Sequence, residues 1–386
     1  MRFGPSDAVT AWNIITGEYP PQTGGVSDYT RMVAEGLADA RDEVCIWAPP
    51  VLGAVPSSRH NLHVNRLPDH FGMRGLKLLA QELESDRSAR VLVEYVPHAF
   101  KMKAMNVPLC LMLLRRRHSD ITVMFHEVAY PISRSQSIRH NALGVINHGM
   151  AAILTRAASR IFVAAQGWTG MLARYAPKGR KIGWMPVPST IPVVRDRAAT
   201  LAARARFATP DSGLLGHFGT YGPWVTSRLQ PALESILSTH QTARVLLIGR
   251  NGEKFHDDFV REHLAFASRV FATGALTESD VSIHIGACDV MIQPYPDGIT
   301  SRNTSALAGL AHGKATATTT GRYSEDIWRR SGAVFLAPDP DAGALARGTI
   351  DLLTDRDRAK AMGCEAIKLY REVFDLDHTI NGLREA

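Results

Sequence analysis

Residues 290–313 read VMIQPYPDGITSRNTSALAGLAHG, and this stretch predicts the fold class of the chain. Its first four residues form a short apolar run that is typical of a buried strand, and Pro294 and Pro296 end that strand. Apolar residues then recur at helical spacing over 306–311, and Gly313 is placed to stop the helix. The stretch therefore predicts a strand, a turn and a helix whose N-terminus lies at the carboxyl edge of a sheet.

The turn of this stretch carries groups that are expected to bind an anion. Thr300 and Ser301 offer hydroxyls suited to capping the helix, and Arg302 is expected in the first helical turn. The free N–H groups and the positive dipole end make such a terminus a natural anion site. Because a cation there opposes the dipole, Arg302 is easier to understand if an anion binds beside it. A solvated surface arginine is the alternative, and this stretch alone does not separate the two.

The composition is that of a globular chain with a basic excess. Its length of 386 residues predicts about two to three domains. The net charge of +7 favours anionic partners such as nucleotides, phospholipid surfaces or nucleic acid. No apolar run reaches the roughly 18 residues of a membrane span, and the residues at the start of the chain lack the apolar core of a signal peptide.

The cysteines and histidines predict neither a disulfide framework nor a metal site. Cys45, Cys110, Cys288 and Cys364 are scattered without a CxxC pair, as expected of reduced thiols in a cytoplasmic protein. The histidines show no HExxH or comparable ligand spacing. We therefore expect no bound metal and a cytoplasmic location.

Strand and helix patterns alternate along both halves of the chain. In the first half, helical patterns such as 76–83 and 142–158 separate strands predicted at 12–16, 44–48, 91–96, 121–125 and 161–165. In the second half, the strands are predicted at 214–218, 245–248, 270–273, 290–293, 315–318 and 333–336. This alternation is typical of a parallel sheet with helices on both faces.

The predicted fold is therefore α/β, with two Rossmann-like, doubly wound parallel-sheet domains that face a central cleft. The Pro-rich, extended segment 185–192 is expected to connect them, which gives domains at 1–190 and 191–372. Ligands of such sheets bind at the carboxyl ends of the strands, and most of the glycine-rich turns fall there.

Two of these glycine-rich turns are candidate ligand contacts. Gly24 and Gly25 follow the first predicted strand, where glycine lets the backbone approach a ligand, although taken alone the pair favours a plain tight turn. Gly219, Thr220 and Tyr221 belong to the turn GHFGTYG, whose N–H groups are suited to wrap a phosphate. No GxGxxG follows a strand and no GK[ST] is present, which disfavours a dinucleotide oxidoreductase and a P-loop protein.

Three further features each have two interpretations. His126 directly follows a predicted strand, so it is either a ligand contact or base, or a loop histidine bonded to backbone. Glu325 precedes an apolar helix and is either a ligand contact or a capping carboxylate. Within residues 101–117, Lys and Arg flank an apolar stretch. This pattern is typical either of a segment that contacts an anionic membrane or of a crossover segment packed on the sheet.

Taken together and in this order, these stretches resemble the retaining glycosyltransferases of family 4, which have the GT-B fold. Residues 18–26, EYPPQTGGV, are similar to the family's glycine loop beside the donor phosphates, and His126-Glu127 is similar to its HD or HE position. Further similarities, from the start of the second domain to the final helix that returns to the first, lie at 187–189, 245–249, 270–274, 294–313, 321–325 and 373–386.

The resemblance implies a metal-independent, retaining transfer of sugar from a nucleotide-diphosphate sugar to a glycan, lipid-linked or small-molecule acceptor, as in polysaccharide biosynthesis. It implies no cofactor and no nucleic-acid partner, and a cytoplasmic location that extends to the inner membrane surface. His126, Asp297 and Arg302 are implied to act in catalysis. The implied substrate contacts are Gly24, Gly25, Gly219, Thr220, Tyr221, Arg250, Thr273, Gly274, Gly298, Ile299, Thr300, Ser301, Asn303, Thr304, Ser305 and Glu325.

The sequence also departs from the family pattern, and the departures leave other functions open. The two positions of the family's Glu-x7-Glu pair fall on Thr300 and Ala308, so neither holds a carboxylate. Asp297 is the expected replacement for the first, and Arg302 for the Arg and Lys that are missing after Gly219. The second hypothesis is a catalytically weak GT-B protein that binds a nucleotide sugar as a regulatory or partner subunit. A third is a sugar epimerase, which forms product without an acceptor.

Overall fold

The chain folds as two compact units in a computed structural model that describes residues 9–52 and 59–385. The first unit comprises Met1–Val187 and Leu376–Ala386, and the second comprises Pro188–Asp375. Residues 1–8, on which the expectation about a signal peptide rests in part, lie outside the described residues. Within the described ranges, no helix combines the length and the apolar character that crossing a membrane requires.

The first unit is built on a seven-stranded parallel sheet in the order β3-β2-β1-β4-β5-β6-β7. Because β1 lies between β2 and β4, the strand order reverses between β1 and β4, where Trp12 pairs with Arg90. The strands are β1 (Ala11–Thr16), β2 (Glu43–Ala48), β3 (Leu62–Arg66), β4 (Arg90–Tyr95), β5 (Ile121–Phe125), β6 (Arg160–Val163) and β7 (Ile182–Trp184).

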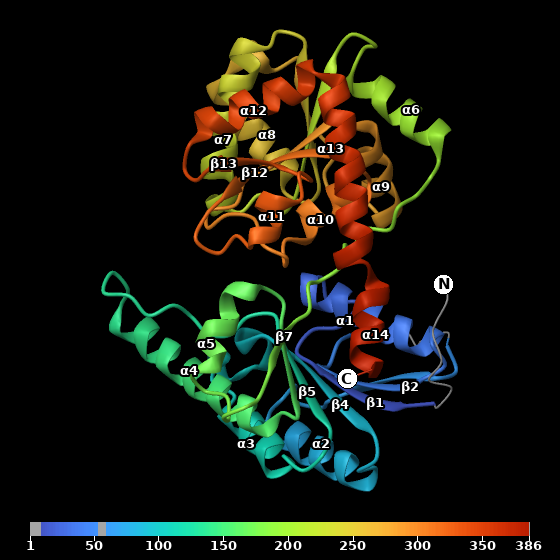
Figure 1. The fold of residues 1–386 in the computed structure, drawn as a ribbon, viewed down its shortest axis with the longest axis vertical. Coiled ribbons are helices and arrows are strands. Elements are labelled where there is room, and N and C mark those ends of the chain that lie inside the picture. Colours follow the sequence, from blue (N-terminus) through green and yellow to red (C-terminus); the bar gives the residue numbers. More distant parts are fainter. Residues whose placement is uncertain (1–8, 53–58, 386) are drawn as a thin grey trace. The chain divides into compact units, whose positions relative to one another are not determined.

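Helices cover both faces of this sheet (Figure 1). On one face, α1 (Gly25–Asp39) packs against the last helix of the chain, α14 (Leu376–Glu385), so the C-terminus returns to the first unit. The other face carries most of the apolar core and is covered by α2 (Met73–Ser85), α3 (Val107–Arg115), α4 (Ile138–Ala157) and α5 (Thr169–Ala173). Short helical turns lie at η1 (Pro97–Phe100), η2 (Met102–Ala104) and η3 (Gln166–Trp168).

The second unit has a six-stranded parallel sheet in the order β10-β9-β8-β11-β12-β13. Here the strand order reverses between β8 and β11, whose first ladder pair is Leu215 with Val290. The strands are β8 (Gly213–Phe218), β9 (Ala243–Ile248), β10 (Val270–Ala272), β11 (Val290–Gln293), β12 (Ala315–Thr320) and β13 (Phe335–Pro338).

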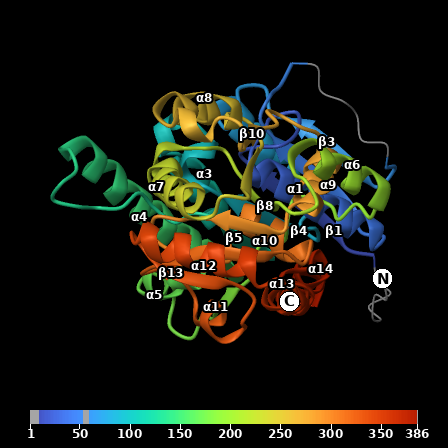
Figure 2. The same ribbon diagram turned by 90° about the horizontal axis from the view of Figure 1, so that it is seen from above.

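This second sheet is also covered on both faces. Figure 2 shows α7 and α12 on the same side of the sheet, where they pack against each other. That face is covered by α7 (Pro223–Thr239), α8 (Gly252–Glu262) and α12 (Ala342–Thr354). The other face is covered by α6 (Arg197–Phe207), α9 (Glu278–Ala287) and α10 (Thr304–Ala311), while α13 (Arg356–Leu369) contacts α10, α12 and β12. Short elements lie at η4 (Leu264–Phe266), α11 (Asp326–Arg330) and η5 (Tyr370–Phe374).

The predicted fold class is confirmed, since both units are doubly wound, parallel α/β sheets. Two strands were not predicted from the sequence, and both have weak apolar patterns. β3 reads LHVNR with one buried residue, and β7 reads IGW with none. Each lies at an edge of its sheet, where one side of the strand has no neighbour and an apolar run is not needed.

Candidate functional site

Each unit has one sheet edge where a ligand is expected. In doubly wound sheets, ligands bind outside the carboxyl ends of the strands at the point where the strand order reverses. That point lies between β1 and β4 in the first unit and between β8 and β11 in the second. Most of the residues expected from the sequence follow these strands or their direct neighbours.

In the first unit, His126 follows β5 directly, and its ring is held by a buried carboxylate. His126 Nε2 lies 2.7 Å from Glu94 Oε2, and the two side chains are 8% and 0% exposed. The Tyr29 ring meets the imidazole edge-on, with 4.7 Å between ring centroids. The simpler interpretation, a loop histidine whose ring bonds to backbone, is therefore wrong: the ring bonds to a carboxylate of the neighbouring strand.

Glu94 is a site residue that the sequence analysis missed. Its Oε1 is buried and has no hydrogen-bond partner within residues 9–52 and 59–385. An unsatisfied buried polar atom costs roughly 1–3 kcal/mol, so it calls for an explanation. The signal was present, because Glu94 interrupts the apolar run VLVEY of β4. A carboxylate in a strand covered on both faces is unusual unless it has a partner.

Three more titratable side chains, His98, Glu127 and Glu18, lie near this pair. His98 Nδ1 lies 3.5 Å from Glu127 Oε2, with both side chains about half exposed. The hydrogen bond to Glu127 raises the pKa of His98. Burial raises the pKa of Glu18, and His98, Glu127 and His126 are all close enough to affect it. This edge of the sheet therefore gathers acid and base groups from the ends of β1, β4 and β5.

The glycine pair lies at the start of α1, as expected, but an acidic residue lies against it. A Cβ at Gly24 would come within 2.4 Å of Glu18 Oε2, so glycine is needed for the Glu18 side chain to lie there. Gly25 is the first residue of α1 and has open space beside it. Ser27 lies inside the first turn and donates to the Gln22 carbonyl at 2.6 Å, so it does not cap α1.

In the second unit, the turn between β11 and α10 differs from its expected form. Helix α10 begins at Thr304, with Asn303 at the N-cap position, so Arg302 precedes the helix and is exposed. The expectation that Arg302 lies in the first helical turn is wrong. The reason is a local side-chain bond, in which Thr300 N and Oγ1 both donate to Asn303 Oδ1, at 2.7 and 2.9 Å. This bond holds 300–303 as a turn and delays the helix.

The backbone N–H groups of this turn are already engaged. Ile299 N donates to the Thr319 carbonyl, Thr300 N to Asn303, and Ser301 N to the carboxylate of Glu325. Because these amides have partners within the chain, the expectation that they form an open anion site is not met. The anion at Ser301 is the side chain of Glu325.

Glu325 joins two loops of the second unit. Its buried carboxylate accepts the Ser301 hydroxyl at 2.7 Å and the Trp328 indole N–H at 2.8 Å. It makes no capping bond to α11, so the interpretation as a capping carboxylate is wrong. Gly298 has φ +83°, and a Cβ there would lie 2.1 Å from Gly321 N. Only glycine fits this contact between the two loops.

Charged side chains border these loops. Asp297 Oδ1 lies 3.1 Å from Arg322 Nε, with both side chains more than half exposed. Arg228 of α7 forms a two-point bond with Asp339, at 2.8 and 3.2 Å, and this bond raises the pKa of Arg228, with a smaller contribution from Asp297. Arg228 is thus a cation near Asp297 that the sequence analysis did not identify, nine residues beyond Gly219.

The last residues of β8 include a buried histidine that contacts the neighbouring strand β11. His217 Nδ1 donates to the Ile292 carbonyl at 2.7 Å, whereas its Nε2 is buried and unpartnered among the described residues. Burial lowers the pKa of His217 to about 4, so the ring is neutral. Gly219 N donates to the Ile248 carbonyl, and Tyr221, at φ +57°, places its hydroxyl 3.1 Å from the His217 carbonyl. Thr220 is exposed beside them.

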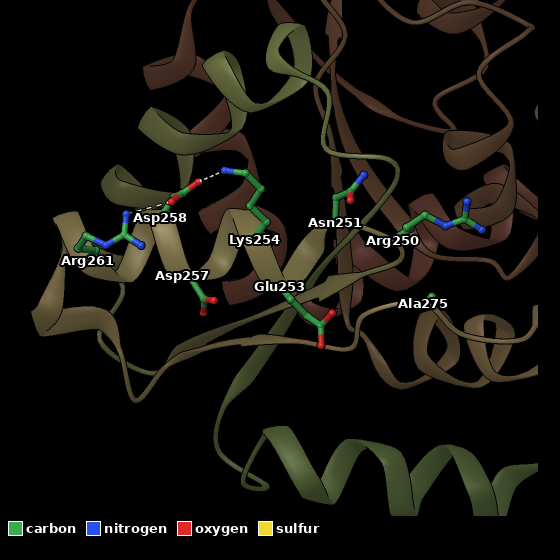
Figure 3. Close-up of a pocket in the computed structure, with 8 residues that line it drawn as sticks. All are labelled: Arg250, Asn251, Glu253, Lys254, Asp257, Asp258, Arg261 and Ala275. Carbon is green, nitrogen blue, oxygen red and sulfur yellow. Dashed lines mark hydrogen bonds and ion pairs between the residues drawn. The ribbon is translucent and has the colours of Figure 1, made fainter.

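The turns after β9 and β10 border a shallow depression of about 590 Å³ (Figure 3). Its walls alternate in charge along α8: Lys254 and Arg261 both contact Asp258, at 2.8 and 3.1 Å. Arg250, an expected substrate contact, belongs to this depression and points away from that ion-pair group (Figure 3). The walls are largely polar, which suits polar groups of a ligand better than a flat apolar ring.

The remaining expected contacts support these turns. Thr273 Oγ1 accepts from Gly249 N at 3.2 Å and donates to the Gly274 carbonyl at 3.0 Å. Ser305 Oγ lies 2.7 Å from the Tyr295 hydroxyl, and Thr304 is the first residue of α10. No cluster of three or more His, Cys, Asp or Glu suited to a metal ion occurs in the part of the chain that the structure describes.

Comparisons with known proteins identify the fold. No family model matches the sequence, and no curated protein matches it. Among solved structures, sucrose-phosphate synthase from Thermosynechococcus elongatus matches with a TM-score of 0.73 at 15% identity, over 97% of this chain and 98% of that chain. WaaG, a glycosyltransferase involved in lipopolysaccharide biosynthesis, gives 0.70 at 14% identity, over 97% and 100%. Anabaena Alr3699/HepE in complex with UDP and glucose gives 0.69 at 13%, over 97% and 98%. The chain therefore has the fold of GT-B glycosyltransferases.

Proposed function

We propose that the protein is a glycosyltransferase that moves a sugar from a nucleotide-diphosphate sugar to an acceptor, with retention of anomeric configuration and without a metal ion. The observation that carries this proposal is the likeness to GT-B structures along 97% of the chain, among them one in complex with UDP and glucose. Retention and the absence of a metal rest on the resemblance of the sequence to family 4.

In the proposed reaction, the acceptor oxygen bonds to the anomeric carbon while the bond to the diphosphate breaks, and a donor phosphate oxygen takes the acceptor proton. Charge on the departing diphosphate is the main quantity to stabilise. Arg302 is exposed in the turn after β11 and is our candidate for this role, with Arg228 as a second cation. Asp297 would release Arg322 and hold sugar hydroxyls.

His126 is proposed to position the sugar or the acceptor. Its Nε2 is committed to Glu94, so Nδ1 is the ring nitrogen left to meet a substrate hydroxyl. Glu94 would fix which nitrogen carries the proton, as a carboxylate does when it orients an imidazole. Glu94 is accordingly a positioning residue rather than a catalytic one.

Binding and turnover with a panel of UDP-, GDP- and ADP-sugars test the proposal. A transferase should bind one donor and release its nucleoside diphosphate faster when an acceptor is added. Binding without turnover across acceptors would favour the catalytically weak subunit, and product formation without any acceptor would favour the epimerase. No binding of any nucleotide sugar would contradict the proposal and both alternatives.

We also propose that the first unit contacts an anionic membrane, but through α4 rather than through 101–117. In α3, Leu109 and Leu113 are buried, and Arg116 bonds to Glu84, so that segment packs on the sheet. By contrast, residues 128–187 contain eight Lys or Arg and no Asp or Glu. Ile138 and Val145 of α4 are 87% and 60% exposed. Exposed apolar side chains within a basic, acid-free surface suit anionic lipid.

A further inference from the structure

A second cavity of the second unit opens at the opposite edge of its sheet, where the strands begin. Its volume is about 580 Å³, a size typical of small-molecule sites. Its lining includes Gly213, the first residue of β8, and Ala315, the first residue of β12. We call it the amino-edge cavity. Since the candidate site lies at the carboxyl ends of the same strands, the two are separate.

Positive charge dominates the amino-edge cavity. Its charged lining residues are two Asp, four Lys or Arg and one His: Asp211, Asp289, Arg204, Lys314, Arg356, Lys360 and His240. Of the two carboxylates, Asp289 already has partners within the chain. It forms an ion pair with Arg204 at 2.9 Å and accepts a hydrogen bond from Leu214 N at 2.7 Å. Only Asp211, which is exposed, remains to balance three cations.

Lys314 has one donor left for a ligand. Its ammonium group donates to the Gly286 carbonyl at 2.6 Å and to the Cys288 carbonyl at 2.7 Å. A lysine ammonium carries three N–H donors, so the third is not used by these bonds. The pKa of Lys314 is lowered, chiefly by burial and to a smaller extent by the nearby Arg204, although Cys288 and Asp289 act in the opposite direction. An anion in the cavity would compensate both effects.

Arg356 and Lys360 are placed unfavourably unless an anion binds near them. Arg356 is the first residue of α13, where a cation opposes the helix dipole. Lys360 follows four residues later, so two like charges lie on the same side of the helix. Neither side chain makes a hydrogen bond or ion pair with the rest of the described chain. By contrast, Arg358 of the same turn lies 3.9 Å from Asp351 and does not line the cavity.

We propose that the amino-edge cavity binds a small phosphate monoester, whose phosphate is held by Lys314, Arg356 and Lys360. A phosphate dianion matches the excess of positive charge and can accept from all three side chains. The cavity has room beyond the phosphate, and the hydroxyl-bearing Thr242 and Thr354 line the rest together with Leu352. The ester group therefore carries polar, hydroxyl-rich chemistry, such as that of a sugar phosphate. The inference does not depend on the proposed transferase activity.

Calorimetric titration with glucose 6-phosphate, inorganic phosphate and glucose tests the proposal, at constant ionic strength. The wild type should bind the ester more tightly than inorganic phosphate, and glucose not measurably. Arg356→Gln/Lys360→Gln should weaken binding of the ester at least ten-fold. The matched control, Arg358→Gln, should stay within two-fold of the wild type. The thermal midpoint of the double variant without ligand should be unchanged or higher, because two unfavourable charges are removed.

Four results would contradict parts of the proposal. The proposed site would be wrong if Arg356→Gln/Lys360→Gln bound the ester as tightly as the wild type does. It would also be wrong if Arg358→Gln weakened ester binding as much as the double variant. Inorganic phosphate that binds as tightly as the ester would overturn the assignment of a monoester. Repeating the titration with saturating UDP checks the location: loss of ester binding under UDP would place it at the carboxyl edge instead.

Discussion

His217 is buried near the end of β8, and its neutral state makes the stability of the fold depend on pH. Burial lowers its pKa from 6.5 to about 4. Between these values the unfolded chain binds a proton that the folded chain does not, so the stability contribution is complete above pH 6.5 and is lost as pH falls towards 4. The loss amounts to about 3 kcal/mol at most, at roughly 1.4 kcal/mol per pKa unit.

His217→Gln should remove this dependence. The free energy of unfolding of the wild type should fall by about 3 kcal/mol more than that of the variant between pH 7 and pH 4. Urea denaturation at several pH values measures the difference. His118→Gln is the control, because His118 is exposed. Parallel curves for the wild type and His217→Gln would show that the ring is not held neutral.

His126 and Glu94 should affect turnover more than nucleotide binding. His126→Ala is expected to lower kcat roughly 100-fold, because a positioned imidazole contributes about that much or more. Glu94→Gln should lower kcat by about ten-fold, since the ring keeps its place but loses the carboxylate that orients it. Calorimetry should find the affinity for free nucleoside diphosphate within about two-fold in both variants.

The half-exposed Glu127 provides the comparison for this pair, and Glu127→Gln should change kcat little. Equal losses of turnover and nucleotide affinity in His126→Ala would contradict the positioning role. A kcat for Glu94→Asp that is higher than that of Glu94→Gln would support the positioning role, whereas a structural role alone predicts no such difference.

The junction of the loops after β11 and β12 depends on one carboxylate. Glu325 accepts hydrogen bonds from Ser301 and Trp328, and an amide side chain can satisfy only part of this set. Glu325→Gln should therefore lower the free energy of unfolding by about 1–3 kcal/mol. Urea denaturation measures this loss, and the exposed Glu365→Gln is the control. Equal stability of Glu325→Gln and the wild type would contradict the dependence of this loop junction on the Glu325 carboxylate.

Helix α4 and the loop before it form the surface proposed to contact a membrane. Figure 2 shows this loop extending away from the sheet of its unit. The wild type should float with vesicles rich in phosphatidylserine at low salt and be released at high salt, because screening weakens the attraction of the basic surface. Ile138→Ser/Val145→Ser should float several-fold less.

The control for flotation is Leu201→Ser, which removes a side chain that is 56% exposed on α6 of the second unit. Flotation should be unaffected by that change. Failure of the wild type to float even at low salt would end the proposal, and an equal loss in Leu201→Ser would show that the contact is not specific to α4.

The last helix of the chain, α14, follows the second unit in sequence but belongs to the first, where it packs against α1. Ile380 of α14 is 1% exposed, and its Cδ1 would lie 2.7 Å from a Cβ at Gly36 of α1. Arg384 lies 3.1 Å from the buried Asp42. Ile380→Ala should lower the free energy of unfolding by about 2–5 kcal/mol and Ile380→Val by about 1 kcal/mol.

Urea denaturation followed through the first unit's buried tryptophans measures these losses. Leu264→Ala, which changes a side chain that is 76% exposed, should leave the curve unchanged. A wild-type curve for Ile380→Ala would mean that α14 contributes little to the folded first unit.

Much of the architecture follows from short-range patterns in the sequence. The alternation of apolar runs and helical periods predicts both sheets, because it reports on the few residues of each element. The extended segment near residue 187 follows from its prolines, which cannot continue a helix or a strand ladder. Candidate positions such as His126 and Gly24 follow from their places after strands, since all parallel strands end at one edge.

The partners of those residues were decided only by the tertiary structure. Glu94 meets His126 across 32 positions and Ser301 meets Glu325 across 24, because β4 lies beside β5 and β11 beside β12. Strand order depends on which surfaces pack together, and no local period records it. The same applies to Arg302. Its helix begins later than the hydroxyls of Thr300 and Ser301 indicate, because hydrogen bonds from Thr300 to the Asn303 side chain outweigh the local preference for helix.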